Sequence, residues 1–196
     1  MNNITFTLLE HISNILVMIF LVRMLLQLGQ ADFHNPISQF IHKFTAPILN
    51  PARRIIPDLG RFSTASFIIA IAIILLKFFI ISMVFIELPT NAMILGILVG
   101  LMMQGVPAMG GIVMIFTNML LILFLGLMIA SFMSGGRYHP GVAFLYQVTR
   151  PILKPVQKII PPIAGSIDLS PMIILFGLWF LQDALYRLGV SLIIGN

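Results

Sequence analysis

Three long stretches of the chain, residues 8–28, 65–86 and 112–134, are predominantly apolar. A bilayer core of about 30 Å needs roughly 20 apolar residues in a helix, and inside lipid only helices and closed barrels satisfy their backbone hydrogen bonds. A fourth stretch, residues 171–194, is long enough to cross but contains Asp183 and Arg187. We therefore predict an all-α membrane protein with four transmembrane helices.

One proline-framed segment occurs twice in the chain. PILNPARRIIP at residues 47–57 returns as PILKPVQKIIP at residues 151–161, with seven of eleven positions identical. Each copy lies in a loop between two predicted spans, residues 29–64 and 135–170, and each loop carries four Lys or Arg residues. Cytoplasmic loops are enriched in Lys and Arg, so these equal charges predict that both loops face the cytoplasm.

The orientation of the two loops also predicts the path of residues 88–111, which join the two halves. Their apolar run, residues 92–103, is only twelve residues long, which is short for a span. A crossing here would also place the basic loops on opposite sides of the membrane. We predict a re-entrant or interfacial connector between two repeats, residues 1–87 and 112–196. The repeats are expected to be tandem hairpins in parallel orientation, with both termini on the outer side of the membrane.

Each basic loop predicts an amphipathic helix in the membrane surface. Asn35-Pro36 and His139-Pro140 are typical of a helix start, with an N-cap followed by proline at the first helical position. Three prolines in each copy are expected to break the rest of the loop into turns. They are Pro47, Pro51 and Pro57 in the first loop and Pro151, Pro155 and Pro161 in the second.

Basic side chains beside these turns are expected to contact anionic lipid headgroups, at about 1 kcal/mol per cation. They are Arg53, Arg54, Lys154 and Lys158. Plain membrane anchoring and a specific lipid or protein ligand both stay open as roles for the loops. No aromatic residues interleave the arginines, so no specific nucleic-acid binding is expected.

Two ionisable side chains, Lys77 and Asp183, lie deep in the predicted spans. A charge at the bilayer centre costs about 2.5–3.5 kcal/mol on insertion scales and is usually paired or functional. Lys77 is twelve residues past Ala65 and Asp183 is twelve past Pro171. We predict that Lys77 and Asp183 pair across the repeat interface. Independent snorkelling of both side chains to the outer surface is the alternative.

Other polar residues of the spans receive structural interpretations. Glu10 is predicted to be interfacial, and Arg23, five residues before the end of its span, is predicted to snorkel to the cytoplasmic surface. Asn118 and Gln182 are predicted to face one another, since uncharged polar side chains in membrane bundles more often join helices than conduct ions.

The repeated motif carries a family resemblance. It combines Asn-Pro, an apolar helix, T-x-P-I-L-x-P-x-x-[RK]-I-I-P, and then Gly and D-x-S-P before a span. This pattern resembles the YggT (YlmG) family of small bacterial and plastid membrane proteins, and coverage is nearly end to end, as in two-repeat gamma-proteobacterial members. The matching residues are Asn35, Pro36, Thr45, Pro47, Pro51, Arg54, Pro57 and Gly60, then Pro140, Thr149, Pro151, Pro155, Lys158, Pro161, Gly165, Asp168, Ser170 and Pro171.

The two copies differ where the family pattern has D-x-S-P. Ser63 stands in the first copy where the second has Asp168, and Ala65-Ser66 stands where the second has Ser170-Pro171. Any chemistry that needs this carboxylate would therefore survive only in the second copy.

The resemblance implies an inner-membrane or plastid-membrane protein linked to osmotic or salt stress, to cell division or nucleoid distribution, or to haem attachment. For this chain it implies a multi-pass protein of the cell inner membrane, in which both termini would be periplasmic. The chain has no Cys, and we find no nucleophile motif, paired carboxylates, metal cluster or phosphate loop. We expect a structural, assembly or stress-tolerance factor without its own catalysis or cofactor, whose partners are the bilayer and a second copy or other envelope proteins. An oligomeric ion channel or osmolyte transporter is the alternative, and a haem or cofactor assembly factor is a weaker one.

Overall fold

The computed structural model describes residues 3–31, 34–85, 94, 96–101, 109–134, 139–160 and 169–194, and these are almost entirely helical. The first half holds α1 (Asn3–Leu28), α2 (Pro36–Ile55) and α3 (Thr64–Val84). The second half holds α5 (Ile112–Ser134), α6 (Pro140–Ile159) and α7 (Ser170–Ile194). Between them, the short strands β1 (Gly100–Leu101) and β2 (Met109–Gly110) pair antiparallel. The predicted all-α class is confirmed.

Among the described helices, three are long and apolar enough to cross a bilayer, over Ile4–Leu28, Thr64–Val84 and Ile112–Ala130. α7 covers the fourth predicted stretch, but its apolar part, Ser170–Leu185, is shorter. Large apolar side chains are exposed on the outer faces of the long helices, as a lipid environment requires. They include Leu76, Phe79, Ile122, Phe176, Trp179 and Phe180. The chain is a multi-pass membrane protein.

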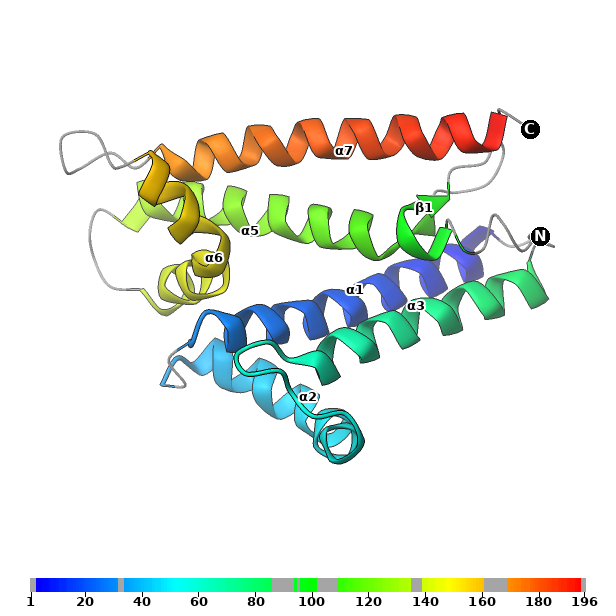
Figure 1. Cartoon of the computed structure of the whole chain (residues 1–196), viewed down its shortest axis with the longest axis horizontal. Coiled ribbons are helices and arrows are strands. Elements are labelled where there is room, and N and C mark those ends of the chain that lie inside the picture. Colours follow the sequence, from blue (N-terminus) through cyan, green and yellow to red (C-terminus); the bar gives the residue numbers. More distant parts are fainter. Residues whose placement is uncertain are drawn as a thin grey trace.

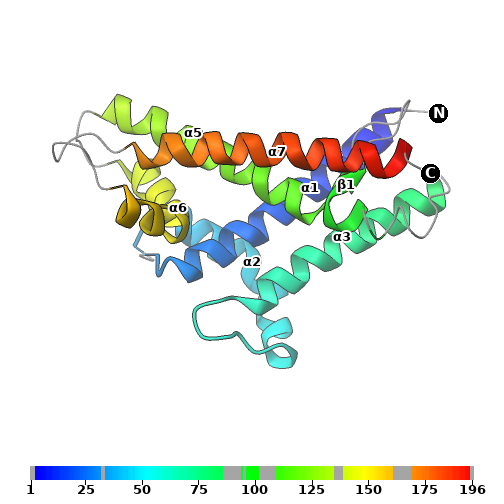
Figure 2. The ribbon, with the colours of Figure 1, turned by 45° about the horizontal axis from the view of Figure 1, so that its top comes forward.

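The long helices form two antiparallel pairs, α1 with α3 and α5 with α7 (Figure 1). α1 and α5 run in one direction, and α3 and α7 run back beside them. α2 and α6 lie at one end of this bundle, whereas the start of α1 and the end of α7 lie at the other (Figure 2). The chain therefore uses the same order of elements twice: a long helix, a helix that lies across the end of the bundle, and a long return helix. We call α2 and α6 the crossing helices.

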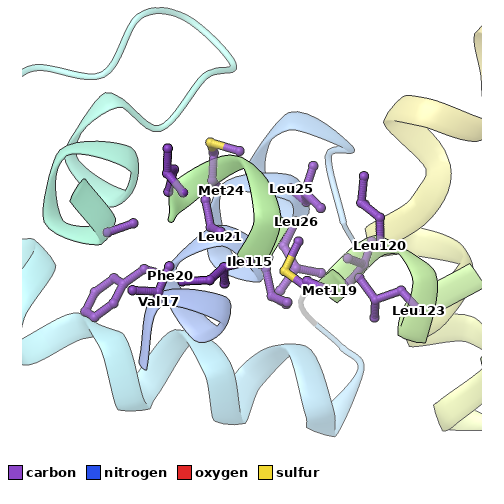
Figure 3. Close-up of a cluster of buried hydrophobic side chains, with 14 of the residues drawn as sticks. Val17, Phe20, Leu21, Met24, Leu25, Leu26, Ile115, Met119, Leu120 and Leu123 are labelled. Carbon is purple, nitrogen blue, oxygen red and sulfur yellow. The ribbon is translucent and has the colours of Figure 1, made fainter. Parts of the chain in front are cut away.

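The core lies where α1 of the first hairpin meets its neighbours, including α5 of the second (Figure 3). Val17 and Phe20 on α1 and Ile115 on α5 are each no more than 1% exposed. Lipid tails are as apolar as these side chains, so the two hairpins gain from dispersion and close fit rather than from leaving water.

The predicted starts of both crossing helices are confirmed. Asn35 Oδ1 accepts a hydrogen bond from the backbone N–H of Ile37 at 2.9 Å, and His139 Nδ1 accepts from that of Gly141 at 3.1 Å. In both helices a proline occupies the first turn, where a missing N–H costs nothing.

The prediction that prolines break these loops into turns is wrong for the first two prolines of each copy. Pro47 and Pro51 lie inside α2, and Pro151 and Pro155 lie inside α6. Each pair is four residues apart, so the missing backbone bonds fall on one helix face, which in α2 is exposed. The helices bend but continue, as the change of direction along α6 shows (Figure 1). α2 ends only just before Pro57.

Gly111, between β2 and α5, occupies a position with no room for a side chain. A Cβ there would lie 2.5 Å from the backbone N of Gly100 and 2.5 Å from the backbone O of Gly96. We expect Gly111→Ala to destabilise the fold by about 1–3 kcal/mol, because backbone must move. Gly177→Ala on α7, where a Cβ meets nothing within 4 Å, is the control. Unfolding in detergent micelles, followed by circular dichroism, measures both, and equal midpoints would contradict the close approach.

Candidate functional site

Glu10 and Lys77 form an ion pair inside the first hairpin. Lys77 Nζ on α3 lies 3.0 Å from Glu10 Oε2 on α1, and the two side chains are 0% and 6% exposed. Glu10 lies early in α1 and Lys77 late in α3, so antiparallel packing brings them to one level. The prediction that Lys77 pairs with Asp183 is wrong, and Glu10, predicted to be interfacial, is instead buried against α3.

Two further residues, Asn14 and Gly110, form hydrogen bonds with this pair, while Glu10 Oε2 has only its ion-pair contact with Lys77 among the described residues. Lys77 Nζ donates to Asn14 Oδ1 at 3.1 Å and to the backbone O of Gly110 at 2.6 Å, as well as to Glu10. Glu10 Oε1 accepts from Asn14 Nδ2 at 2.9 Å and from the backbone N–H of Gly110 at 2.7 Å. An ammonium group has three donors, and all three of them have an acceptor here.

The charged pair binds both polar backbone groups of Gly110. Gly110 belongs to β2, outside any helix, and non-helical backbone within a membrane protein must find partners inside the protein. The carboxylate of Glu10 takes its N–H and the ammonium of Lys77 takes its C=O. The end of the connector, at Gly110, is thus fixed to α1 and α3. Most of the connector, whose path is predicted to be re-entrant or interfacial, lies outside the described residues.

The second hairpin holds an uncharged version of the same contact. Gln182 Nε2 on α7 donates to Asn118 Oδ1 on α5 at 2.8 Å, which confirms the prediction that these two residues face one another. Asn118 follows Asn14 by 104 residues, and Gln182 follows Lys77 by 105. In each hairpin an Asn on the first long helix therefore accepts a hydrogen bond from a longer side chain on the return helix.

The error over Asp183 has a geometric cause. Asp183 and Lys77 each lie twelve residues past the start of their predicted spans, Pro171 and Ala65. The hydrogen bonds to Asn14 and Asn118 show instead that Gln182 occupies the position equivalent to Lys77. One residue turns a helix by about 100°, so Asp183 faces away from the α5–α7 contact. Its side chain is 52% exposed and pairs with Arg187 at 2.8 Å, one turn along the same helix.

A second polar cluster lies where α1, α2 and α3 meet at the other end of the hairpin. Arg53 Nη2 lies 3.1 Å from Asp58 Oδ2 and donates to Gln27 Oε1 at 2.6 Å. Gln27 Nε2 donates to Asp58 Oδ2 at 3.0 Å, and Ser63 Oγ donates to Asp58 Oδ1 at 3.3 Å. Arg53, predicted to contact headgroups, is held within the protein. Arg23, predicted to snorkel, is only 3% exposed.

Several other motif residues belong to the crossing helices, Gly60 lies in the turn before α3, and Ser170 and Pro171 begin α7. Thr45 and Thr149 are fully buried, and their hydroxyl groups donate to the carbonyls of Ile41 and Leu145, each at 2.8 Å. Asn35 Nδ2 also donates to the carbonyl of Pro140 at 2.7 Å, which links the two repeats. Arg54, Lys154 and Lys158 are exposed. Pro161, Gly165 and Asp168 lie outside the described residues.

His42 on α2 reports on the second cluster. Its burial, and then the positive charges of Arg23 and Arg53, lower the pKa of His42 from 6.5. The unfolded chain then binds more protons than the folded one just below pH 6.5, so the stability contributed here falls as the pH falls through that window. Nuclear magnetic resonance titration of His42 should give a midpoint below 6.5, and Arg23→Leu should raise it. A midpoint at or above 6.5 would contradict this placement.

The charged pair can be replaced by the uncharged residues that occupy the equivalent positions in the second hairpin. Glu10→Met with Lys77→Gln copies Met114 and Gln182 of the second hairpin and keeps a donor for Asn14. Either change alone leaves one charge buried without its partner, which costs about 3–5 kcal/mol. We expect the double variant to be more stable than either single variant by unfolding in detergent. Asp183→Asn, at an exposed pair, should cost under about 1 kcal/mol. Additive losses from the two single changes would contradict the pairing.

Comparison with known proteins identifies a family whose model matches this chain twice. The family model CCB3/YggT matches residues 2–84 and again residues 106–189. The starts of these segments are 104 residues apart and their ends 105, the same offsets that relate the two Asn positions and the Lys77–Gln182 positions. The chain is thus a tandem repeat of one family unit. No solved structure matches it.

Similar proteins occur in several bacteria. The protein named "Uncharacterized protein YggT" of Escherichia coli (strain K12) is 34% identical over 93% of this chain and 88% of its own length. "Uncharacterized protein in proC 3'region" of Vibrio alginolyticus is 33% identical over 92% of this chain and 91% of its own. The chain belongs to the CCB3/YggT family.

Proposed function

We propose that the protein is a membrane scaffold or assembly factor, which organises or stabilises other envelope components and has no catalysis of its own. The internal use of its intramembrane polar groups supports this proposal. Glu10, Lys77 and Asn14 bind one another and Gly110, and Gln182 binds Asn118. Groups that bind one another in this way join helices, whereas a conduction path needs polar groups that can exchange partners with an ion or solute.

The proposed topology has four membrane-spanning helices, α1, α3, α5 and α7, which form two parallel hairpins in the inner membrane. The crossing helices α2 and α6 lie on the cytoplasmic surface and both termini are periplasmic. α2 exposes the apolar side chains of Phe40, Phe44 and Ile48, which suit the acyl boundary of a membrane surface. The exposed cations Arg54, Lys154 and Lys158 would contact anionic headgroups.

The proposed partners are membrane components that meet the apolar faces of the long helices. Met172, Phe176 and Trp179 of α7 are exposed and are available to a second copy, another envelope protein or lipid tails. A role in tolerance of osmotic stress fits a protein that supports the envelope. The alternative is an oligomeric ion channel, for which the buried Glu10–Lys77 pair would be the site.

Ion flux through proteoliposomes distinguishes these functions. We expect the purified wild-type chain to conduct no more than empty vesicles across imposed potassium and osmotic gradients. The Glu10→Met, Lys77→Gln double variant, which removes both charges and keeps the hairpin contact, is the matched control. In a bacterial strain without its own family member, the double variant should support growth at high osmolarity as well as wild type does. Flux that disappears in a folded double variant would overturn the scaffold proposal in favour of the channel.

A further inference from the structure

Arg23 is a buried cation with unused hydrogen-bonding capacity. It lies five residues before the end of α1 and is only 3% exposed. Its Nε is buried without a hydrogen-bond partner in the part of the chain that the structure describes. Burying a charge is costly unless it is paired and hydrogen-bonded. Arg23 therefore needs a physical reason to be there.

The surroundings of Arg23 carry one positive charge in excess. Arg53 and Asp58 are its electrostatic neighbours, and Asp58 is already engaged by Arg53 at 3.1 Å. Two guanidinium groups thus share one carboxylate. Arg53 makes its contacts through Nη2, and its Nε is also buried without a partner among the described residues. A guanidinium binds a phosphate or carboxylate through two adjacent donors, and in both arginines at least one donor is free.

The first turn of α3 adds to the positive potential at this place. Ser63 is the N-cap of α3, but its side chain makes no capping hydrogen bond and is directed to Asp58 and Ser66 instead. A helix N-terminus favours anions through its dipole and free N–H groups. The buried Arg23 and this helix start belong to one junction, between α1, α2 and α3.

The second hairpin shows that this fold does not require the arginines. At the 104-residue offset, Leu127 stands at the position of Arg23 and Gln157 at that of Arg53. Leu127 is 4% exposed, so the position is buried in both hairpins. An apolar side chain fills it in one copy and an incompletely bonded cation fills it in the other. The cation therefore serves something beyond packing.

We propose that the junction of α1, α2 and α3 binds a phosphate group, supplied either by the headgroup of a phospholipid or by a free phosphate ion. Arg23 lies at the bottom of the site, and Arg53 and the start of α3 form its wall. The side chains of Arg53 and Asp58 are 30% and 20% exposed, so this side of the junction is partly accessible from outside the protein. The single negative charge of a phosphodiester balances the single excess positive charge of the junction.

The depth of Arg23 agrees with a lipid source. Five residues of helix span about 7.5 Å, so in the proposed topology Arg23 lies just below the end of α1, near the headgroup layer. This site differs from the attraction between surface cations and the bilayer, because its cation is buried and salt screens it less. It does not depend on the scaffold proposal, since a channel could also hold such a lipid.

Thermal unfolding of the delipidated full chain in an uncharged detergent tests the site. Phosphatidylglycerol in mixed micelles and inorganic phosphate are added in separate titrations, and each midpoint shift gives an apparent affinity. We expect phosphatidylglycerol to raise the unfolding midpoint. Arg23→Leu, which copies Leu127, should weaken this binding about ten-fold or more. The same change should raise the midpoint of the lipid-free protein, because it removes an incompletely bonded buried charge.

Two further variants make each outcome decisive. Arg54→Gln removes an exposed cation from the same helix and should leave the titration unchanged. Arg23→Lys keeps the charge but loses the two adjacent N–H donors of the guanidinium group. This variant should bind phosphatidylglycerol more weakly than wild type, and it keeps the test valid even if Arg23→Leu does not fold. A shift with inorganic phosphate alone would support the site and assign it to a soluble anion. Equal weakening by Arg54→Gln and Arg23→Leu, or unchanged binding in both Arg23 variants, would overturn the proposal.

Discussion

A lysine and a glutamate can stay charged inside a membrane protein only when each is paired and hydrogen-bonded, and this condition organises the first hairpin. The Glu10–Lys77 pair joins α1 to α3. It also takes both backbone groups of Gly110, which no helix satisfies. The low dielectric of the protein interior strengthens such contacts and raises the free-energy cost of losing one partner. The packing of α1 against α3 and the position of the connector therefore depend on one another.

The second hairpin shows which part of this arrangement is general. Both hairpins join their long helices through an Asn that accepts a hydrogen bond from the return helix. Only the first hairpin adds charge, and only there does the charge bind the described end of the connector. We infer that the amide contact belongs to the repeated unit, whereas the ion pair accompanies the junction between units. A neutral pair cannot supply so strong an acceptor and so strong a donor to one glycine.

Sequence reasoning predicted the features that depend on long or repeated patterns. Apolar runs and the duplicated segment indicated the helices and the repeat, and Asn118 and Gln182 were recognisable as isolated polar residues in apolar helices. Partners of charged residues depend on helix rotation, where one residue changes the face, so Lys77 was matched to Asp183 instead of Glu10. The continuous helix through Pro47 and Pro51 was missed because proline rules describe one lost bond at a time. Whether the bonds lost at two prolines fall on an exposed face depends on tertiary packing.

The contact between α1 and α5 has a consequence for how such proteins assemble. In this chain the two hairpins are covalently joined, so their association does not depend on the amount of protein in the membrane. A relative with one repeat would have to obtain from another molecule what α5 gives to α1, and what the carbonyl of Pro140 gives to Asn35. Its folding would then rise and fall with its own abundance, whereas a tandem chain remains complete even at a few copies per cell.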